Sequence, residues 1–179
     1  MRAIETLEGP LIFDASALFI FGHRDGLEKL LGKLHEAFKL LVTPEVQEQT
    51  VKKITYRAYY EKLIEQHFTV KAGTPATKLS DSIAEMTKRL GNADASVIVL
   101  ALATQGTLVI DDKLARREAR SLNARITGSL GVLRYALGKN WISDGELRPA
   151  IDALRINGFR IPPFKGNQSF DEYLQSLAE

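Results

Sequence analysis

The fold is decided by the stretch Leu11-Ile12-Phe13-Asp14-Ala15-Ser16, in which three apolar residues are followed at once by a carboxylate. A short apolar run of this kind is typical of a buried strand, and α/β proteins build their sites at the carboxyl ends of such strands. The same layout recurs at Thr107-Leu108-Val109-Ile110, which Asp111 and Asp112 follow. We therefore expect the ends of two strands to bring carboxylates into one cleft.

Beyond this stretch, short apolar runs alternate along the chain with segments whose apolar residues repeat at helical spacing. Further strands are predicted at residues 40–42, 68–70 and 124–126. Helices are predicted at residues 17–21, 27–38, 44–64, 79–90, 93–103, 113–121, 130–137 and 144–157 and near residue 170. This alternation predicts right-handed βαβ units and a doubly wound, mostly parallel sheet with helices on both faces.

The length of 179 residues suits one domain, for which we expect a core over about residues 10–160 and a C-terminal helical extension to residue 179. No cysteine is present, which excludes disulfides and thiolate metal sites. The histidines lack metal-ligand spacing, so oxygen ligands are expected for any metal. The net charge of +2 does not by itself indicate nucleic-acid binding. Neither a signal-peptide layout nor a membrane-spanning run is found, and we expect a cytoplasmic protein.

The acids at these strand ends each have an ordinary explanation when taken singly. Asp14 could form a turn that caps the next segment, and Asp111 or Asp112 could cap the basic helix that follows. Asp94 lies in the first turn of an otherwise apolar helix, where the backbone dipole favours it by ~0.3–1 kcal/mol. Taken together, acids gathered in one cleft need metal or protons to neutralise them, which makes a divalent metal the first hypothesis.

Five blocks resemble the PIN-domain nucleases. Phe13-Asp14-Ala15-Ser16 is similar to the D-x-S/T opening of that family. Residues 90–101 resemble its acidic helix, and residues 108–113 resemble its strand that ends in an acid. The blocks at 115–119 and 127–133 look like an uncharacterised prokaryotic branch close to VapC-type toxins. The resemblance covers most of residues 10–160 in the family's order.

The resemblance implies a PIN-like three-layer α/β/α domain and a metal-dependent ribonuclease. PIN domains hold one or two Mg²⁺ or Mn²⁺ ions between three or four acids and hydrolyse phosphodiester bonds. By position, Asp14, Asp94 and Asp112 match the first, third and fourth acids of the family. Ser16 matches a supporting hydroxyl residue, and Asp111 ranks second to Asp112.

The second acid departs from the family pattern. The family expects an acid after a Pro-x-Val stretch, and alignment on residues 44–46 places Gln49 there. A shift in register would bring Glu48 to the metal, with Glu45 in reserve because it shares a helix face with Gln49. The alternative is that both glutamates face solvent, which would weaken one metal site.

Basic residues follow the last acid directly. Lys113, Arg116 and Arg117 are predicted to contact RNA phosphates, and the alternative is a solvated helix face. The resemblance further suggests a toxin that acts as a homodimer and that an antitoxin protein blocks. The competing hypothesis is a catalytically weakened PIN domain that binds RNA or protein. A response-regulator-like phosphoacceptor is disfavoured, because it gives Asp94 no role.

Overall fold

In the computed structural model, residues 6–23, 27–52, 56–74 and 80–177 are described. Their strands are β1 (Leu11–Phe13), β2 (Leu40–Val42), β3 (Thr69–Val70), β4 (Thr107–Val109) and β5 (Arg125–Thr127). Their helices are α1 (Ala15–Phe21), α2 (Glu28–Ala37), α3 (Pro44–Val51), α4 (Arg57–His67), α5 (Ser80–Leu90), α6 (Asn92–Thr104), α7 (Lys113–Ser121), α8 (Ser129–Gly138), α9 (Asp144–Ile156) and α10 (Phe170–Ser176). None of the described helices is long and apolar enough to cross a membrane.

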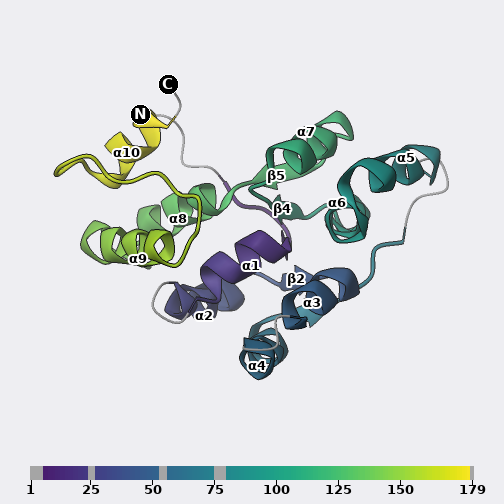
Figure 1. The fold of residues 1–179 in the computed structure, drawn as a ribbon, viewed down its shortest axis with the longest axis horizontal. Helices are drawn as coiled ribbons and strands as arrows, with labels where there is room; N and C mark the ends of the chain where they lie inside the picture. The colour runs from purple at the N-terminus through teal and green to yellow at the C-terminus, as the bar shows by residue number, and fades with distance from the viewer. Residues whose placement is uncertain (1–5, 24–26, 53–55, 75–79, 178–179) are drawn as a thin grey trace.

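The strands form one parallel sheet with helices around it, as Figure 1 shows. Every residue of β1, β2 and β4 is buried. Successive side chains of a strand point to opposite faces, so helices must cover both faces of the sheet. The predicted three-layer α/β/α fold is confirmed.

The order of the strands, β3-β2-β1-β4-β5, locates the site. The chain moves outward from β1 to β2 and β3, and then returns to place β4 on the other side of β1. This reversal is the topological switch point of a doubly wound sheet, where a crevice opens beyond the carboxyl ends of the two central strands. Asp14 follows β1 and residues 110–112 follow β4, so the acids named from sequence border that crevice.

Local sequence explains how the helices next to the sheet begin. Asp14, Thr43 and Asp112 each accept a hydrogen bond from a backbone N–H in the first turn of α1, α3 and α7, respectively. Pro44 at the start of α3 lacks the N–H that would have had no partner there. Short polar residues after apolar runs therefore end the strands and start the helices.

Two predicted boundaries differ from the structure. The single helix expected over residues 44–64 is two helices, α3 and α4, which pack against each other. The helix predicted to begin at residue 93 begins one residue earlier, at Asn92; its cap is Gly91, whose φ of 88° is favourable for glycine. The predicted start of α5 at Leu79 lies outside the described residues.

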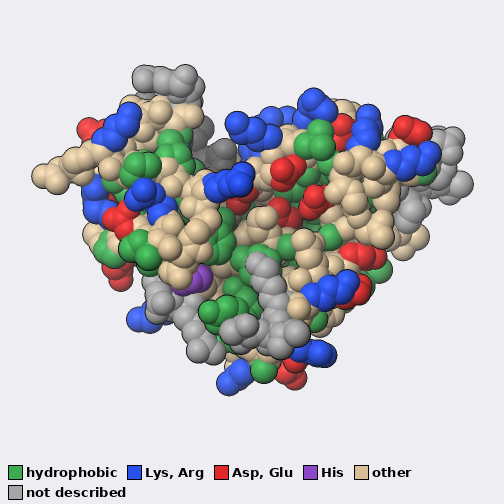
Figure 2. Space-filling view, in the orientation of Figure 1, with side chains coloured by type: hydrophobic (Ala, Val, Ile, Leu, Met, Phe, Trp, Pro, Cys, Tyr) green, Lys and Arg blue, Asp and Glu red, His purple; other side chains and the backbone are tan. Residues whose placement is uncertain are grey.

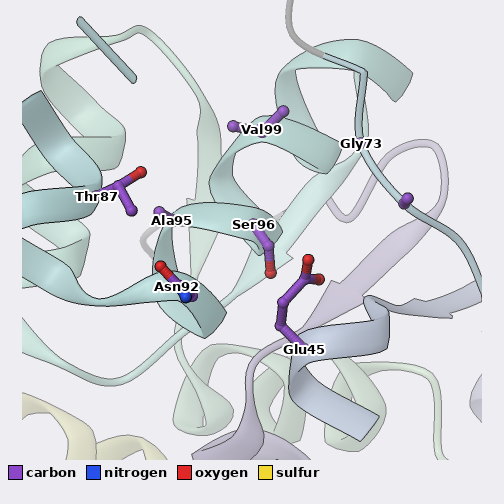
Figure 3. A pocket seen from close by; sticks show the side chains of 8 residues that line it. Glu45, Gly73, Thr87, Asn92, Ala95, Ser96 and Val99 are labelled. Carbon is purple, nitrogen blue, oxygen red and sulfur yellow. The ribbon is translucent and has the colours of Figure 1, made fainter. Parts of the chain in front are cut away.

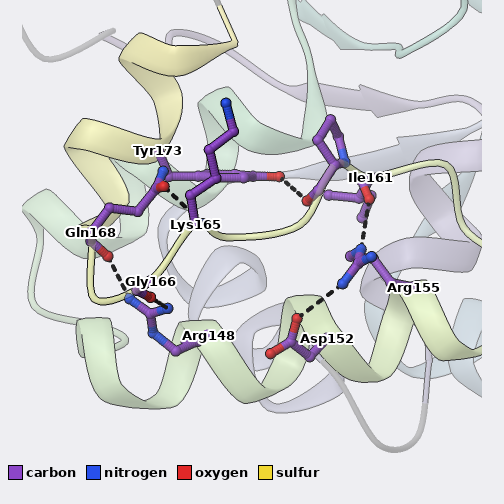
Figure 4. Close-up of polar contacts among 9 residues, drawn as sticks. Arg148, Asp152, Arg155, Ile161, Lys165, Gly166, Gln168 and Tyr173 are labelled. Carbon is purple, nitrogen blue, oxygen red and sulfur yellow. Dashed lines mark hydrogen bonds and ion pairs between the residues drawn. The ribbon is translucent and has the colours of Figure 1, made fainter.

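The C-terminal segment packs on α8 and α9 through α10. In Figure 4 the loop before α10 is held by side chains of α9 and α10. Arg148 donates to the carbonyls of Gly166 and Gln168 and lies 4.4 Å from the centre of the Phe164 ring. The buried Tyr173 donates to the carbonyl of Pro162 at 2.8 Å. The segment is therefore fixed by polar and apolar contacts together.

Candidate acidic active site

Asp14 is the most buried of the acids named from sequence, with 2% of its surface exposed. Its Oδ1 accepts a hydrogen bond from the N–H of Ala17 at 2.6 Å, and the N–H of Asp111 also acts to lower the pKa of the carboxylate. Burial, helped by the charges of Asp111 and Asp94, nevertheless raises the pKa of Asp14 to about 7. A carboxylate held in this way is a strong candidate to receive a cation.

Asp94 and Asp112 lie close enough to interact electrostatically. Asp94 lies in the first turn of α6, and α6 packs on β1 and β4. Its pKa is raised, first by burial and then by the negative charge of Asp112. Asp112 is exposed, and its Oδ1 accepts a hydrogen bond from the N–H of Ala115 at 2.8 Å. The structure thus brings three of the four predicted ligands into electrostatic contact.

Asp111 has a different environment from these acids. Its Oδ1 accepts from the N–H of Ser129 at 2.9 Å, and its Oδ2 accepts from the Ser129 hydroxyl at 2.5 Å. The side chain of Asp111 therefore joins the end of β4 to the start of α8. Sequence reasoning missed Ser129 as a partner, although the block at residues 127–133 contained it.

The structure brings neither glutamate of α3 to Asp94. Glu48 is exposed and forms an ion pair with Lys52 at 2.9 Å. Gln49 is exposed as well. Glu45 points from α3 toward Ser96 into a pocket of about 240 Å³, as Figure 3 shows. The pocket is lined by Glu45, Ala72, Gly73, Thr87, Asn92, Ala95, Ser96 and Val99.

This pocket lies on a different face of α6 from Asp94. Asn92, Ser96 and Val99 are spaced at one helical turn, whereas Asp94 precedes Ser96 by two residues and so points about 200° away from it. One oxygen of Glu45 is buried without a protein partner. The predicted register shift toward Glu48 does not produce a fourth acid beside the other three.

The supporting and basic residues lie around the acids. Ser16 is exposed in the first turn of α1, and Lys113 and Arg117 are exposed on α7. Arg116 is half-buried and donates to the carbonyl of Ile110 at 2.7 Å. In Figure 2, acidic side chains gather near the middle of the face between α1, α6 and α7, and basic side chains lie along the edge over α7. A polyanion that approached the acids would meet these cations first.

The donor set fits a divalent cation in its chemistry. The acids supply carboxylate oxygens, which Mg²⁺ and Mn²⁺ prefer, and a cation beside Asp14 would relieve the cost of a buried negative charge. Within the described residues, no three His, Cys, Asp or Glu side chains are arranged to hold one ion as they stand. The site therefore has the right ligand type, and its side chains would have to turn to enclose a metal.

The family model described as "DUF3368: PIN domain" matches residues 10–175. The chain belongs to the PIN-domain family. PIN domains are in general nucleases, and in general they use divalent metals. The resemblance noted in the sequence at Asp14, residues 90–101 and residues 108–113 is confirmed at the level of the family.

One solved structure shares this fold, and a second aligns with the chain more weakly. PAE2754 from Pyrobaculum aerophilum aligns with a TM-score of 0.50 at 16% identity, over 72% of this chain and 96% of that one. VapBC2 from Rickettsia felis, solved with a DNA fragment from its promoter, aligns with a TM-score of 0.45 at 16% identity, over 66% of this chain and 97% of that one. No curated protein sequence matches the chain.

Proposed function

We propose that this PIN domain is a metal-dependent endoribonuclease. The observation that carries the proposal is Asp14, a buried carboxylate at the switch point of the sheet whose pKa is raised by burial and by neighbouring acids. A structural carboxylate is normally paired with a cation, whereas the side chains acting on Asp14 include two further acids. Such an arrangement is expected where function requires a cation.

Asp14, Asp94 and Asp112 would hold Mg²⁺ or Mn²⁺. The metal would supply an activated water and would stabilise the negative charge that develops on the phosphate. The chain's own contribution is to hold two of these carboxylates in place: Asp14 through the N–H of Ala17, and Asp112 through the N–H of Ala115. Glu48 remains the proposed fourth ligand on sequence grounds, with Gln49 in the family position and Glu45 in reserve.

RNA is the proposed substrate, with Lys113 and Arg117 as phosphate contacts. Both are exposed on the first two turns of α7, directly after Asp112. Arg116, also named for this role, has one guanidinium nitrogen bound to the carbonyl of Ile110, so only the rest of its side chain is available to a phosphate. Contacts of this kind hold the backbone without reading its sequence.

Cleavage of a mixed single-stranded RNA tests the proposal. Wild-type protein is incubated with Mn²⁺, with Mg²⁺ or with EDTA, beside the double variant Asp14→Asn and Asp94→Asn. We expect cleavage only with metal and only by the wild type, because the variant loses two anionic ligands while keeping side-chain size. Cleavage that survives EDTA, or that the double variant retains, would contradict the proposal.

The second candidate is a PIN domain with weakened catalysis that binds RNA or protein. It is favoured by Gln49, which stands where the family has an acid, and by Glu48, which is paired with Lys52. Thermal unfolding with increasing Mn²⁺ separates the two, because an ion that binds only the folded state raises the Tm by mass action. A raised Tm without cleavage would favour the second candidate. In that case Gln49→Glu should restore cleavage, with Gln47→Glu on the same helix as the control.

We further propose that the protein is a toxin and that a partner protein covers its acids. We also propose that it forms a homodimer in the cytoplasm. Co-expression with a small protein encoded next to it should relieve growth arrest caused by the wild type, while Asp14→Asn should arrest nothing. Sedimentation of the purified protein should give twice the mass of one chain. Growth unaffected by the wild type would remove the toxin role and leave the nuclease proposal intact.

A further inference from the structure

We infer that Asp111 is a positioning residue, tethered by Ser129, and not a ligand of the metal. This inference rests on the proposed nuclease function and deepens it, because it separates the two adjacent acids at the end of β4. Asp112 would be a ligand of the metal. Asp111 would fix the turn that carries Asp112 and lies beside Asp14.

The first line of evidence is that both carboxylate oxygens of Asp111 accept hydrogen bonds. Oδ1 accepts from the backbone N–H of Ser129 at 2.9 Å, and Oδ2 accepts from its hydroxyl at 2.5 Å. Ser129 is buried and begins α8, where a backbone N–H has no partner inside the helix. Asp111 supplies that partner, and the loss of its side chain would leave a buried donor unsatisfied.

The second line of evidence is the position of the Asp111 backbone. The end of β4 lies against Asp14, whose N–H donates to the carbonyl of Val109 at 3.2 Å, so the placement of the turn that follows β4 affects how Asp14 is held. The preceding residue is fixed as well, because the N–H of Ile110 donates to the carbonyl of Thr127 at 3.0 Å. The hydrogen bonds between Asp111 and Ser129 connect the ends of β4 and β5 one residue further along the chain.

The third line of evidence is Gly128. A Cβ at this residue would lie 2.8 Å from Oδ1 of Asp111 and 2.9 Å from Nη1 of Arg116. Its φ of −108° is open to any residue, so a Cβ here would displace the ends of these two side chains without straining the backbone. Arg116 meanwhile binds the carbonyl of Ile110 at 2.7 Å and closes the same turn from its other side.

Substitutions at Asp111 distinguish a tether from a ligand. Asparagine keeps an acceptor for the N–H of Ser129 and can donate to its hydroxyl, whereas alanine keeps neither contact. We expect Asp111→Ala to lower kcat and to raise the Mn²⁺ concentration that gives half-maximal cleavage, by about 10- to 100-fold, as for residues that orient metal ligands. Asp111→Asn should stay within a few-fold of the wild type in both quantities.

A ligand would give the opposite pattern. Asp111→Asn would then lose cleavage as fully as Asp14→Asn does, because an amide supplies no anionic oxygen. That result would overturn the inference, and so would wild-type behaviour of Asp111→Ala. The KM for RNA should not change, since the tether does not contact substrate.

Gly128→Ala disturbs the same turn without replacing either acid. We expect it to resemble Asp111→Ala in kcat and in the Mn²⁺ requirement. Gly145→Ala is the matched control, because a Cβ there meets nothing within 4 Å. If Gly128→Ala retains wild-type kcat and Mn²⁺ dependence, the turn does not position Asp112 and Asp14 as we infer.

A double-mutant cycle gives a readout that does not need activity. The unfolding of Asp111→Ala, Ser129→Ala and their combination is followed in urea, and we expect the combination to be no less stable than the worse single variant. Additive losses would overturn the tether. If the wild type neither cleaves RNA nor gains Tm with Mn²⁺, the nuclease proposal fails, while this cycle still decides whether Asp111 and Ser129 are coupled.

Discussion

Two opposing effects determine whether the carboxylate of Asp14 is charged. As the N-cap of α1 it accepts an N–H bond from Ala17, which favours the charged carboxylate. Burial disfavours the charge and outweighs that bond, so the pKa of Asp14 rises to about 7. The sequence indicated the cap and the strand end, and it could not indicate this balance, because burial depends on segments distant in the chain.

The raised pKa of Asp14 predicts how stability changes with pH in metal-free protein. The folded state holds this proton up to about pH 7, whereas the unfolded chain releases it near the ordinary pKa of an aspartate, 3.8. The stabilisation is therefore complete below about pH 4 and is lost as the pH rises through about 7, by up to about 4 kcal/mol. Urea unfolding in EDTA at several pH values measures the loss.

Asp14→Asn is the control for this experiment, since an amide does not titrate and still accepts the N–H of Ala17. The free energy of unfolding of the variant relative to the wild type should rise between about pH 4 and about pH 8. Parallel curves for the two proteins would show that Asp14 is charged throughout that range. Added Mn²⁺ should reduce the difference at high pH, because a cation stabilises the carboxylate.

At the scale of elements, α3 and α6 are joined by one buried polar contact. The Thr43 hydroxyl lies 2.7 Å from that of Ser96 and accepts the N–H of Val46 at 3.3 Å. Because the Ser96 hydroxyl donates to the carbonyl of Ala93, the Thr43 hydroxyl must be the donor between the two. This contact sets the distance between the helix of the acid Asp94 and the helix on which the family carries its second acid.

Thr43→Val should destabilise the protein by about 1–2 kcal/mol, because it removes the cap of α3 and the link to Ser96 while keeping the shape of the side chain. Thr43→Ser retains the hydroxyl and should cost much less. Thermal or urea unfolding of the two variants gives the comparison. Equal stability of valine and serine variants would mean that the hydroxyl contributes nothing.

Helix α7 carries the prediction about RNA. If Lys113 and Arg117 each contact one phosphate, their replacement by glutamine should weaken binding and should reduce the slope of log K against log salt by about 0.7 per residue. Lys62→Gln is the control, because Lys62 is exposed on α4, away from α7 (Figure 1). Binding of labelled RNA to the Asp14→Asn protein at several salt concentrations measures the slope, and an unchanged slope would exclude these contacts.

Sequence reasoning succeeded for elements with strong local patterns. The strands at residues 107–110 and 40–42 were found from their apolar runs. The division between α3 and α4 was missed, because the residues of both helices favour helix and the break depends on how the two helices pack. The orientation of Glu45 was missed for a similar reason, since it depends on where α6 lies.

At the scale of the whole molecule, the C-terminal segment is part of the packed structure. Tyr173 is fully buried and stacks on Phe164 with ring centres 4.3 Å apart. We propose that residues 1–179 unfold as one domain. Sequence indicated the helix near residue 170 but not its role, because the partners of Tyr173 lie in a loop without periodicity.

Tyr173→Ala should lower the stability of the entire protein by about 3–5 kcal/mol, because it empties a buried aromatic site. Tyr173→Phe should cost about 0.5–1.5 kcal/mol for the lost bond to Pro162. Calorimetry should show one transition that moves to lower temperature in both variants. Two separate transitions, with only the first one shifted, would show that the segment unfolds independently.

The strand order has a consequence for synthesis of the protein. Asp14 leaves the ribosome early, but β4, which pairs with β1, and the acids that act on Asp14 come later in the chain. A nascent chain that has been translated only as far as β3 therefore has Asp14 without Asp94 and Asp112, and no complete site. If the protein attacks cellular RNA, this order of translation protects the ribosome that makes it until most of the chain has been released.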